Sequence, residues 1–151
     1  MAKRSAGILP YRRRDGALQV LLVHPGGPFW ARKDAGAWSI AKGEYAAPEP
    51  ALDAAIREFE EETGHRLPGP FVVLEPVRLK SGKVIDAWAT EADWDLSGFR
   101  SNTFELEYPK GVVKTYPEVD RIEWFAIDVA VMKIHQGQAN LLRQLQALLN
   151  P

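Results

Sequence analysis

Hydrophobic spacing predicts several strands in the first third of the chain. Residues 5–13 and 17–24 both form apolar segments, and Asp15-Gly16 between them is typical of a tight hairpin turn. The second segment contains an unbroken Val-Leu-Leu-Val run, which is typical of a strand buried on both faces. A loop rich in glycine and proline then leads to a short predicted strand at residues 38–40.

One central helix, further strands and a terminal helix are predicted after that loop. Pro50 and Gly64 favour the two ends of a helix over residues 50–63. Asp128 is placed to cap a short helix, and leucines at helical spacing predict a last helix over residues 138–149. Four more strands are expected, over residues 71–79, 83–92, 102–108 and 121–127.

This order of elements predicts an α/β (α+β) fold. A mixed sheet would carry helices against its faces, because strands and helices are interleaved along the chain. We find no internal repeat and no low-complexity linker, and 151 residues suit one domain of ordinary size. We therefore expect a single domain over residues 1–151.

The composition narrows the class of protein. The chain has no cysteine and a formal net charge of −1. The absence of cysteine excludes disulfides, thiol catalysis and sulfur-based zinc sites. The small net charge gives no indication of binding to a nucleic acid or a membrane surface. No stretch approaches the roughly 20 apolar residues that cross a bilayer. We expect a soluble, cytoplasmic protein, and the sequence leaves open whether it forms a homodimer.

Three glutamates lie on one face of the predicted central helix. A helix turns by about 100° per residue, so Glu58, Glu61 and Glu62 share a face while Glu60 points away from it. Each like-charge pair at a spacing of three or four costs a few tenths of a kcal/mol. The negative end of the helix dipole disfavours these anions by a further ~0.3–1 kcal/mol.

A bound cation would explain this costly arrangement. An acidic helix face is most often simply solvated. A divalent ion would relieve the repulsion, however, and ligation by oxygen alone indicates Mg²⁺ or Mn²⁺. Upstream on the same face, Ala51, Ala54 and Ala55 are small enough to leave room for a ligand to approach.

The spacing of residues around the glutamates is specific. Gly43 is followed after five residues by Glu49, and after seven more by the run Arg57-Glu58-Phe59-Glu60-Glu61-Glu62-Thr63-Gly64. This pattern resembles the signature of the Nudix hydrolases, G-x5-E-x7-R-E-U-x-E-E-x-G-U, in which U is a bulky apolar residue. All seven fixed positions match. His65 departs from it, because the family usually has an aliphatic residue there.

The resemblance implies a fold, a reaction and a cofactor. It implies a Nudix-type α/β/α sandwich whose central helix is catalytic, and Mg²⁺- or Mn²⁺-dependent hydrolysis of a pyrophosphate bond in a nucleoside diphosphate linked to a group X. Carried over by position, Glu58, Glu61 and Glu62 resemble the catalytic metal ligands, and the Gly43 carbonyl would join them. Arg57 resembles a residue that orients a glutamate.

Substrate contacts are expected on both sides of this segment. Glu49 would orient ligands or contact substrate, and Lys42 is a plausible phosphate contact. Arg32 and Trp38 are weaker candidates for binding substrate. A glutamate outside the signature serves some family members as base or extra ligand, which indicates Glu105 or Glu107 here, although a solvated strand face explains these two equally well.

The resemblance to small single-domain members with a Lys-Gly-Glu run, here at residues 42–44, implies a nucleoside triphosphate or a dinucleoside polyphosphate as substrate. Two alternatives stay open. One is an ADP-ribose or sugar-nucleotide pyrophosphatase, and the other is a non-catalytic nucleotide-binding regulator on the same fold. The intact glutamate cluster argues against the regulator.

Overall fold

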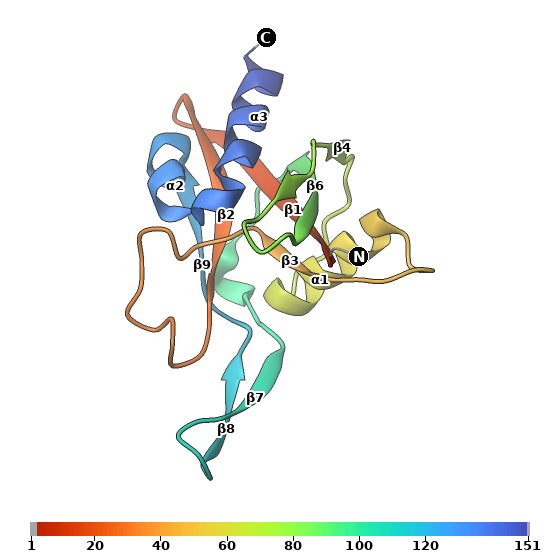
Figure 1. Ribbon diagram of the computed structural model, residues 1–151. Coiled ribbons are helices and arrows are strands. Elements are labelled where there is room, and N and C mark those ends of the chain that lie inside the picture. The colour runs from red at the N-terminus through yellow and green to blue at the C-terminus, as the bar shows by residue number, and fades with distance from the viewer. Residues whose placement is uncertain (1–2, 151) are drawn as a thin grey trace.

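A mixed β-sheet forms the centre of the computed structural model, which describes residues 3–150 (Figure 1). Its strands follow the order β4-β6-β1-β2-β9, with β3 on β1 and β5 on β6. The strands of this sheet are β1 (Arg4–Arg14), β2 (Ala17–Pro25), β3 (Ala41–Glu44), β4 (Val72–Val73), β5 (Val77–Arg78), β6 (Val84–Glu91) and β9 (Val119–Ala126).

Strand β1 organises the sheet because it has three partners. Its last residues pair with β2 across the turn at Asp15 and Gly16, whose φ values of 55° and 77° confirm the predicted hairpin. Its first residues pair antiparallel with β3 on one side and parallel with β6 on the other. β3 and β2 therefore pair with different parts of β1, β3 with its first half and β2 with its last residues, and β2 then pairs with β9.

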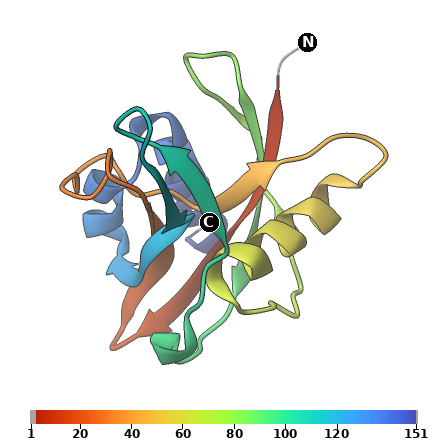
Figure 2. The ribbon, with the colours of Figure 1, turned by 90° about the horizontal axis from the view of Figure 1, so that it is seen from below.

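Helices cover both faces of this sheet, as expected (Figure 2). Helix α1 (Ala51–Thr63) packs on one face, and α2 (Ile127–Lys133) and α3 (Ala139–Leu149) pack on the other. Two single-turn 3₁₀ helices, η1 (Leu96–Gly98) and η2 (Gln136–Gln138), complete the helical elements of the described residues.

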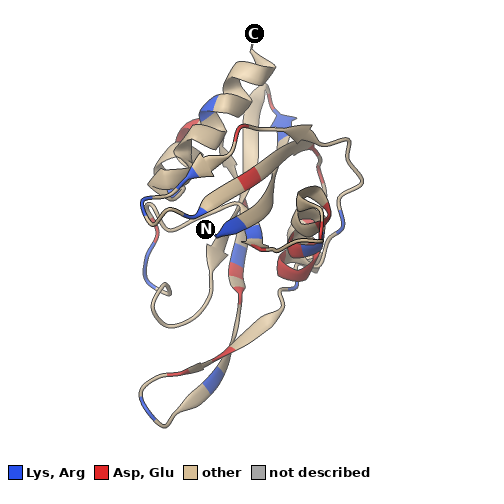
Figure 3. Ribbon diagram, turned by 45° about the vertical axis from the view of Figure 1, so that its right-hand side comes forward, with Lys and Arg blue, Asp and Glu red and all other residues tan. Residues whose placement is uncertain are grey.

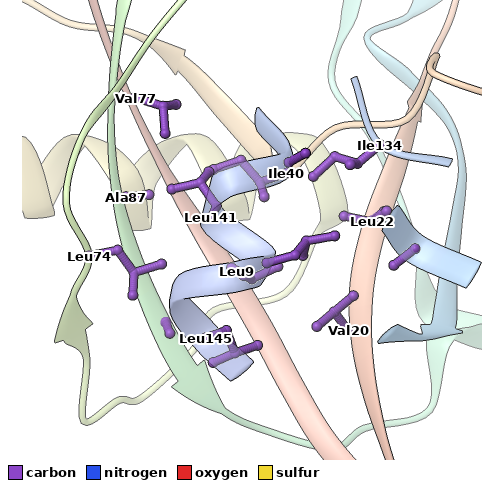
Figure 4. Close-up of a cluster of buried hydrophobic side chains, with 14 of the residues drawn as sticks. Leu9, Val20, Leu22, Ile40, Leu74, Val77, Ala87, Ile134, Leu141 and Leu145 are labelled. Atoms are coloured by element: carbon purple, nitrogen blue, oxygen red, sulfur yellow. The ribbon is translucent and has the colours of Figure 1, made fainter. Parts of the chain in front are cut away.

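Strand β2 is buried on both faces, which confirms the prediction from its apolar run. Leu21 and Val23 face α1, whereas Val20 and Leu22 face α3, where Leu141 and Leu145 meet them (Figure 4). Alternate side chains of a strand point to opposite faces, so one strand supplies both cores.

A second, two-stranded sheet projects from the body of the molecule (Figure 1). It consists of β7 (Thr103–Glu107) and β8 (Val113–Pro117). Backbone hydrogen bonds hold its base. The Asn102 amide donates to the Glu61 carbonyl at the end of α1, and the Glu118 amide donates to the Asn102 carbonyl. Both ends of the hairpin therefore start beside α1.

Three local expectations need correction, and one strand was missed. Trp38 and Ser39 form isolated bridges, and residues 38–40 are not a strand. The predicted strand at 71–79 is broken into β4 and β5, because Glu75-Pro76 interrupts it. Strand β8 was not predicted. Asp128 lies in the first turn of α2 rather than at its cap, which is Ala126.

The structure also corrects the role expected for two alanines. Ala54 and Ala55 are fully buried in the core between α1 and β1. Their small size lets the helix approach the sheet closely and leaves no room for a ligand there. No helix within residues 3–150 is long and apolar enough to cross a membrane.

Candidate active site

Arg57 holds three of the glutamates together. Its Nε and Nη2 donate to the two Glu49 carboxylate oxygens at 2.9 and 3.0 Å. Its Nη1 donates to Glu58 at 2.9 Å and to Glu61 at 3.2 Å. These hydrogen bonds, above all those to Glu49, raise the pKa of Arg57, and the bonds from Arg57 lower the pKa of Glu49. The guanidinium thus offsets the repulsion that the spacing of the acids creates.

Gly43 lies at a position where any side chain would displace the Glu58 carboxylate. It stands opposite Ala6 in the β1–β3 register, and a Cβ at this position would collide with the Glu58 carboxylate. The absence of a Cβ therefore allows the carboxylate to lie against the backbone of β3. A carboxylate and the backbone of residue 43 are brought together from two elements.

Glu62 faces the same region from the last turn of α1. Burial, and after it the charge of Glu58, raises the pKa of Glu62 to about 9. Without a cation, this carboxyl is therefore protonated at neutral pH. Buried acids with raised pKa values cluster at functional sites, although structural networks also produce them.

Glu118 joins the site from the base of the hairpin, and the sequence analysis did not identify it. It lies on the exposed rim between β8 and β9, where partial burial and the charge of Glu58 raise its pKa. Its only sequence signal was an acidic residue just before the predicted strand at 121–127. Proximity to α1 comes from the hairpin's backbone bonds, which sequence reasoning could not supply.

The Lys42 ammonium lies near these acids and has no partner among the described residues. Its side chain is mostly buried, and it makes no hydrogen bond or ion pair with any residue between 3 and 150. Burial lowers the pKa of Lys42 first, and the charge of Lys83 lowers it further, against the opposing charges of Glu62, Glu44 and Glu58. A buried, unpaired ammonium is costly, so the position favours an anionic ligand.

Apart from Arg57 and Glu49, which do not line it, these groups surround one cavity of about 390 Å³. It is lined by Ser5, Lys42, Gly43, Glu44, Glu58, Glu61, Glu62, Lys83, Asn102 and Glu118. A smaller cavity of about 160 Å³ shares Lys42, Glu62 and Glu118 with it and extends between β2, β3 and β9. Figure 3 shows acidic positions gathered on α1. The cavity combines hard oxygen ligands with cationic groups.

Four residues predicted to contribute lie elsewhere. Trp38 is 1% exposed in the core, where its Nε1 donates to Asp34 and its ring meets Phe125, so the geometry gives no support for a substrate contact. Arg32 is exposed on the loop before it. Neither residue lines the cavity, and neither do Glu105 and Glu107, which are exposed on the projecting hairpin.

The cavity suits a divalent cation in the chemistry of its donors. Glu58, Glu61 and Glu62 offer only oxygen, as Mg²⁺ and Mn²⁺ prefer, and the Gly43 cradle brings one of them to a backbone strand. As arranged, no three acidic or histidine side chains in residues 3–150 already converge at ligand distances. Glu61 is hydrogen-bonded to Arg57, so its side chain would have to reorient to bind a cation.

Comparison with known proteins gives a family and a fold. A family model for the NUDIX domain matches residues 1–145. The NUDIX domain of Shewanella oneidensis NrtR, solved with ADP ribose, superposes with a TM-score of 0.71 at 18% identity, covering 99% of this chain and 90% of that one. A C. elegans Ap4A hydrolase in a binary complex gives a TM-score of 0.66 at 20% identity, with 98% of both chains covered.

A third structure is similar over nearly its whole length. The E. coli ORF135 protein gives a TM-score of 0.58 at 23% identity, covering 99% of this chain and 93% of that one. No curated protein sequence gives a significant match. The fold, the signature residues and the family match agree, and the chain belongs to the Nudix family. Within that family it is a hydrolase of pyrophosphate bonds.

Proposed function

We propose that this enzyme hydrolyses a nucleoside triphosphate or a dinucleoside polyphosphate in the presence of Mg²⁺ or Mn²⁺. The observation that carries the proposal is the cavity itself. An acidic cluster and the unpaired Lys42 ammonium face one space, which is what a metal-bound, anionic phosphate chain requires.

Glu58, Glu61 and Glu62, with the Gly43 carbonyl, would hold the cation. When bound, the ion neutralises charge on phosphate oxygens and lowers the pKa of a bound water. Arg57 positions the glutamates, since it contacts Glu58 and Glu61 while Glu49 holds its other edge. The contacts of Glu49 favour an orienting role over direct contact with substrate.

Lys42 would donate to a phosphate oxygen of the substrate. Burial strengthens such a charge-assisted hydrogen bond, because the local dielectric is low. Lys42 lines the cavity, and it stands opposite Gly7, where a Cβ would lie 2.7 Å from the Lys42 Cβ. The missing side chain at residue 7 therefore makes room for the stem of Lys42.

Glu118 is the strongest candidate for the residue that takes the proton from water. It lines the cavity, and its raised pKa brings it nearer to the range in which a general base works. Glu105 and Glu107 are weaker candidates because they lie further along the same hairpin and outside the cavity.

A panel of nucleotides tests the proposal. The protein would be incubated with Mg²⁺ and each nucleotide, and the products would be identified by chromatography and phosphate release. We expect turnover that a chelator abolishes and that Glu62→Gln lowers by about 10²-fold or more. Glu60→Gln is the matched control, because Glu60 points away from the cavity and pairs with Arg66.

Two other outcomes would change the conclusion. Preferred turnover of ADP-ribose would favour the sugar-nucleotide alternative, for which the similarity to a domain solved with ADP ribose is the supporting observation. Tight binding of nucleotides without turnover of any of them would contradict hydrolysis and favour a regulator.

A further inference from the structure

Lys83 faces the same cavity from a different element. It follows the turn at Ser81 and Gly82, directly before β6, and its side chain is 27% exposed. Its ammonium lies 3.4 Å from the Glu44 carboxylate. Neither the Nudix signature nor the proposed mechanism uses this residue, although it lines the cavity with Glu58 and Glu62.

The cavity has an acidic wall, formed by Glu58, Glu61 and Glu62 of α1, and a basic wall, formed by Lys42 and Lys83. Alternate residues of a strand point in opposite directions. Gly43 faces the Glu58 carboxylate, so Lys42 and Glu44 on either side of it point away from α1. Lys83 meets Glu44 on that far side. The metal ligands and the two lysines therefore border one space from opposite directions.

The basic wall carries more positive charge than its own acid can balance. Glu44 is shared between Lys83 at 3.4 Å and Lys3 at 3.9 Å, and Lys42 has no partner among residues 3–150. Within this wall, two lysines thus accompany one glutamate, which also contacts the exposed Lys3. A solvated surface pair would explain Lys83 and Glu44 alone, but it leaves the mostly buried Lys42 beside a second ammonium.

An unsatisfied hydroxyl lies in the same wall. Ser5 stands opposite Glu44 in the β1–β3 register and lines the cavity. It is 1% exposed, and its Oγ has no hydrogen-bond partner among the described residues. Buried hydroxyls are normally bonded, so this wall is short of acceptors as well as of negative charge.

We propose that Lys83, together with Lys42, binds a third phosphate of the substrate, beyond the two nearest the acidic residues of α1. This inference rests on the proposed function and deepens it. A third consecutive phosphate supplies negative charge to both lysines, whereas a neutral sugar in the same place leaves the Lys42 ammonium unpaired and Lys83 with Glu44 alone. Lys83 is thus a specificity-determining residue for substrates with three or more consecutive phosphates, and it disfavours ADP-ribose and other sugar nucleotides.

Substitution of Lys83 tests this role. Lys83→Met keeps the aliphatic stem and removes the charge, and Lys80→Met is the control on the neighbouring exposed turn. The ratio kcat/KM would be measured with Mg²⁺ for ATP, diadenosine tetraphosphate and ADP-ribose. We expect Lys83→Met to lower kcat/KM for the first two by tenfold or more, mainly through KM, and to change it for ADP-ribose by less than twofold.

Inorganic tripolyphosphate and pyrophosphate give a readout that does not need turnover. We expect tripolyphosphate to raise the melting temperature of the wild-type and Lys80→Met proteins more than pyrophosphate does, and Lys83→Met to abolish the difference. This measurement stands even if no nucleotide is hydrolysed, which is the result that would overturn the proposed function.

Two results would overturn the inference while leaving the hydrolase intact. One is an equal loss of activity of Lys83→Met on all three nucleotides, since Lys83 would then not discriminate between them. The other is a wild-type preference for ADP-ribose, together with equal stabilisation by the two inorganic anions.

Discussion

Arg57 is the residue on which the arrangement of the acidic helix face depends. Its planar guanidinium contacts Glu49, Glu58 and Glu61 at once, and each contact is a charge-assisted hydrogen bond. Exposed ion pairs contribute little to stability in general. The value of this group of contacts therefore lies in holding carboxylates in place rather than in stabilising the fold.

Replacement of Arg57 by lysine separates these two effects. A single ammonium cannot reproduce the bidentate contact with Glu49 and still reach the other two acids. We expect Arg57→Lys to lower kcat by about 10- to 100-fold while the urea midpoint changes little. Arg66→Lys, which alters an exposed pair with Glu60, is the control. Unchanged kcat in Arg57→Lys would contradict the positioning role.

Glu62 links metal binding to pH. Its pKa of about 9 in the metal-free protein means that a cation must displace a proton at neutral pH. We expect the affinity for Mg²⁺ to rise by up to tenfold per pH unit between about pH 6 and 8, with release of about one proton. Calorimetry in buffers of different ionisation enthalpy measures both. A pH-independent affinity would contradict this assignment.

The same group makes a separate prediction for the stability of the metal-free protein. The pKa of Glu62 is raised from its ordinary value of 4.5 to about 9 on folding. Its contribution is thus fully present below about pH 4.5 and is lost as the pH rises to about 9. Glu62→Gln should therefore be more stable than wild type at pH 8 in the presence of chelator, by urea denaturation. Glu60→Gln should show no such gain.

The C-terminal end of α1 lies beside the segment that leads into the β7–β8 hairpin. Gly64 adopts a left-handed φ of 77° and bonds back to the Glu60 carbonyl, which ends the helix directly after its glutamates. The Arg100 amide, which leads into the hairpin, donates to the Thr63 carbonyl. His65, the one departure from the signature, stacks on Trp94 with ring centroids 4.3 Å apart. This stacking takes the place of the apolar packing expected of an aliphatic residue there.

Substitution at this helix end tests the connection. Gly64→Ala places an L side chain in the left-handed region and sets its Cβ 3.0 Å from the Arg100 carbonyl oxygen. Gly16→Ala has the same φ of 77° but open space around it, so it measures the backbone strain of about 1–2 kcal/mol alone. We expect Gly64→Ala to cost more than Gly16→Ala in urea denaturation. Equal losses would show that the contact with residue 100 is unimportant.

Local signals explain which elements the sequence could predict. Pro50 and Gly64 gave α1 to within one residue, and Asp15-Gly16 gave the first hairpin. The position of Glu118 could not be predicted in this way, because it depends on pairing between Asn102 and Glu118. Charge-based reasoning selected Glu105 and Glu107 on the same hairpin, since an alternating strand shows its polar face but not its distance from the helix.

At the scale of the molecule, the site lies where three distant segments meet. Residues 42–44, 57–62 and 118 come together because β1 pairs with β3 at one end and with β2 at the other. The signature was readable because it is contiguous, and its spacing indicated the family that the matched profile confirms. The basic wall could not be predicted from the sequence, since Lys83 is brought to it only by the β1–β6 pairing.

Metal binding is therefore expected to stabilise the whole fold. A ligand that binds only the folded state adds RT ln(1 + [L]/Kd), about 2.7 kcal/mol at a concentration 100 times Kd. Mg²⁺ should raise the melting temperature of the wild-type protein by several degrees. The shift should vanish with excess chelator and shrink in Glu58→Gln. A melting temperature unaffected by millimolar Mg²⁺ or Mn²⁺ would argue against a metal site.

The meeting of separate segments limits what a fragment of this chain can do. A synthetic peptide of residues 43–65 would contain all seven fixed positions of the family signature. It would lack the strand that Gly43 pairs with, the hairpin acid and both lysines of the opposite wall. An isolated 13-residue helix is marginal in water, and its crowded acids weaken it further. Such a peptide should be largely unstructured by circular dichroism, even with magnesium. The pattern is enough to identify the family, but the metal and nucleotide site forms only in the complete sheet.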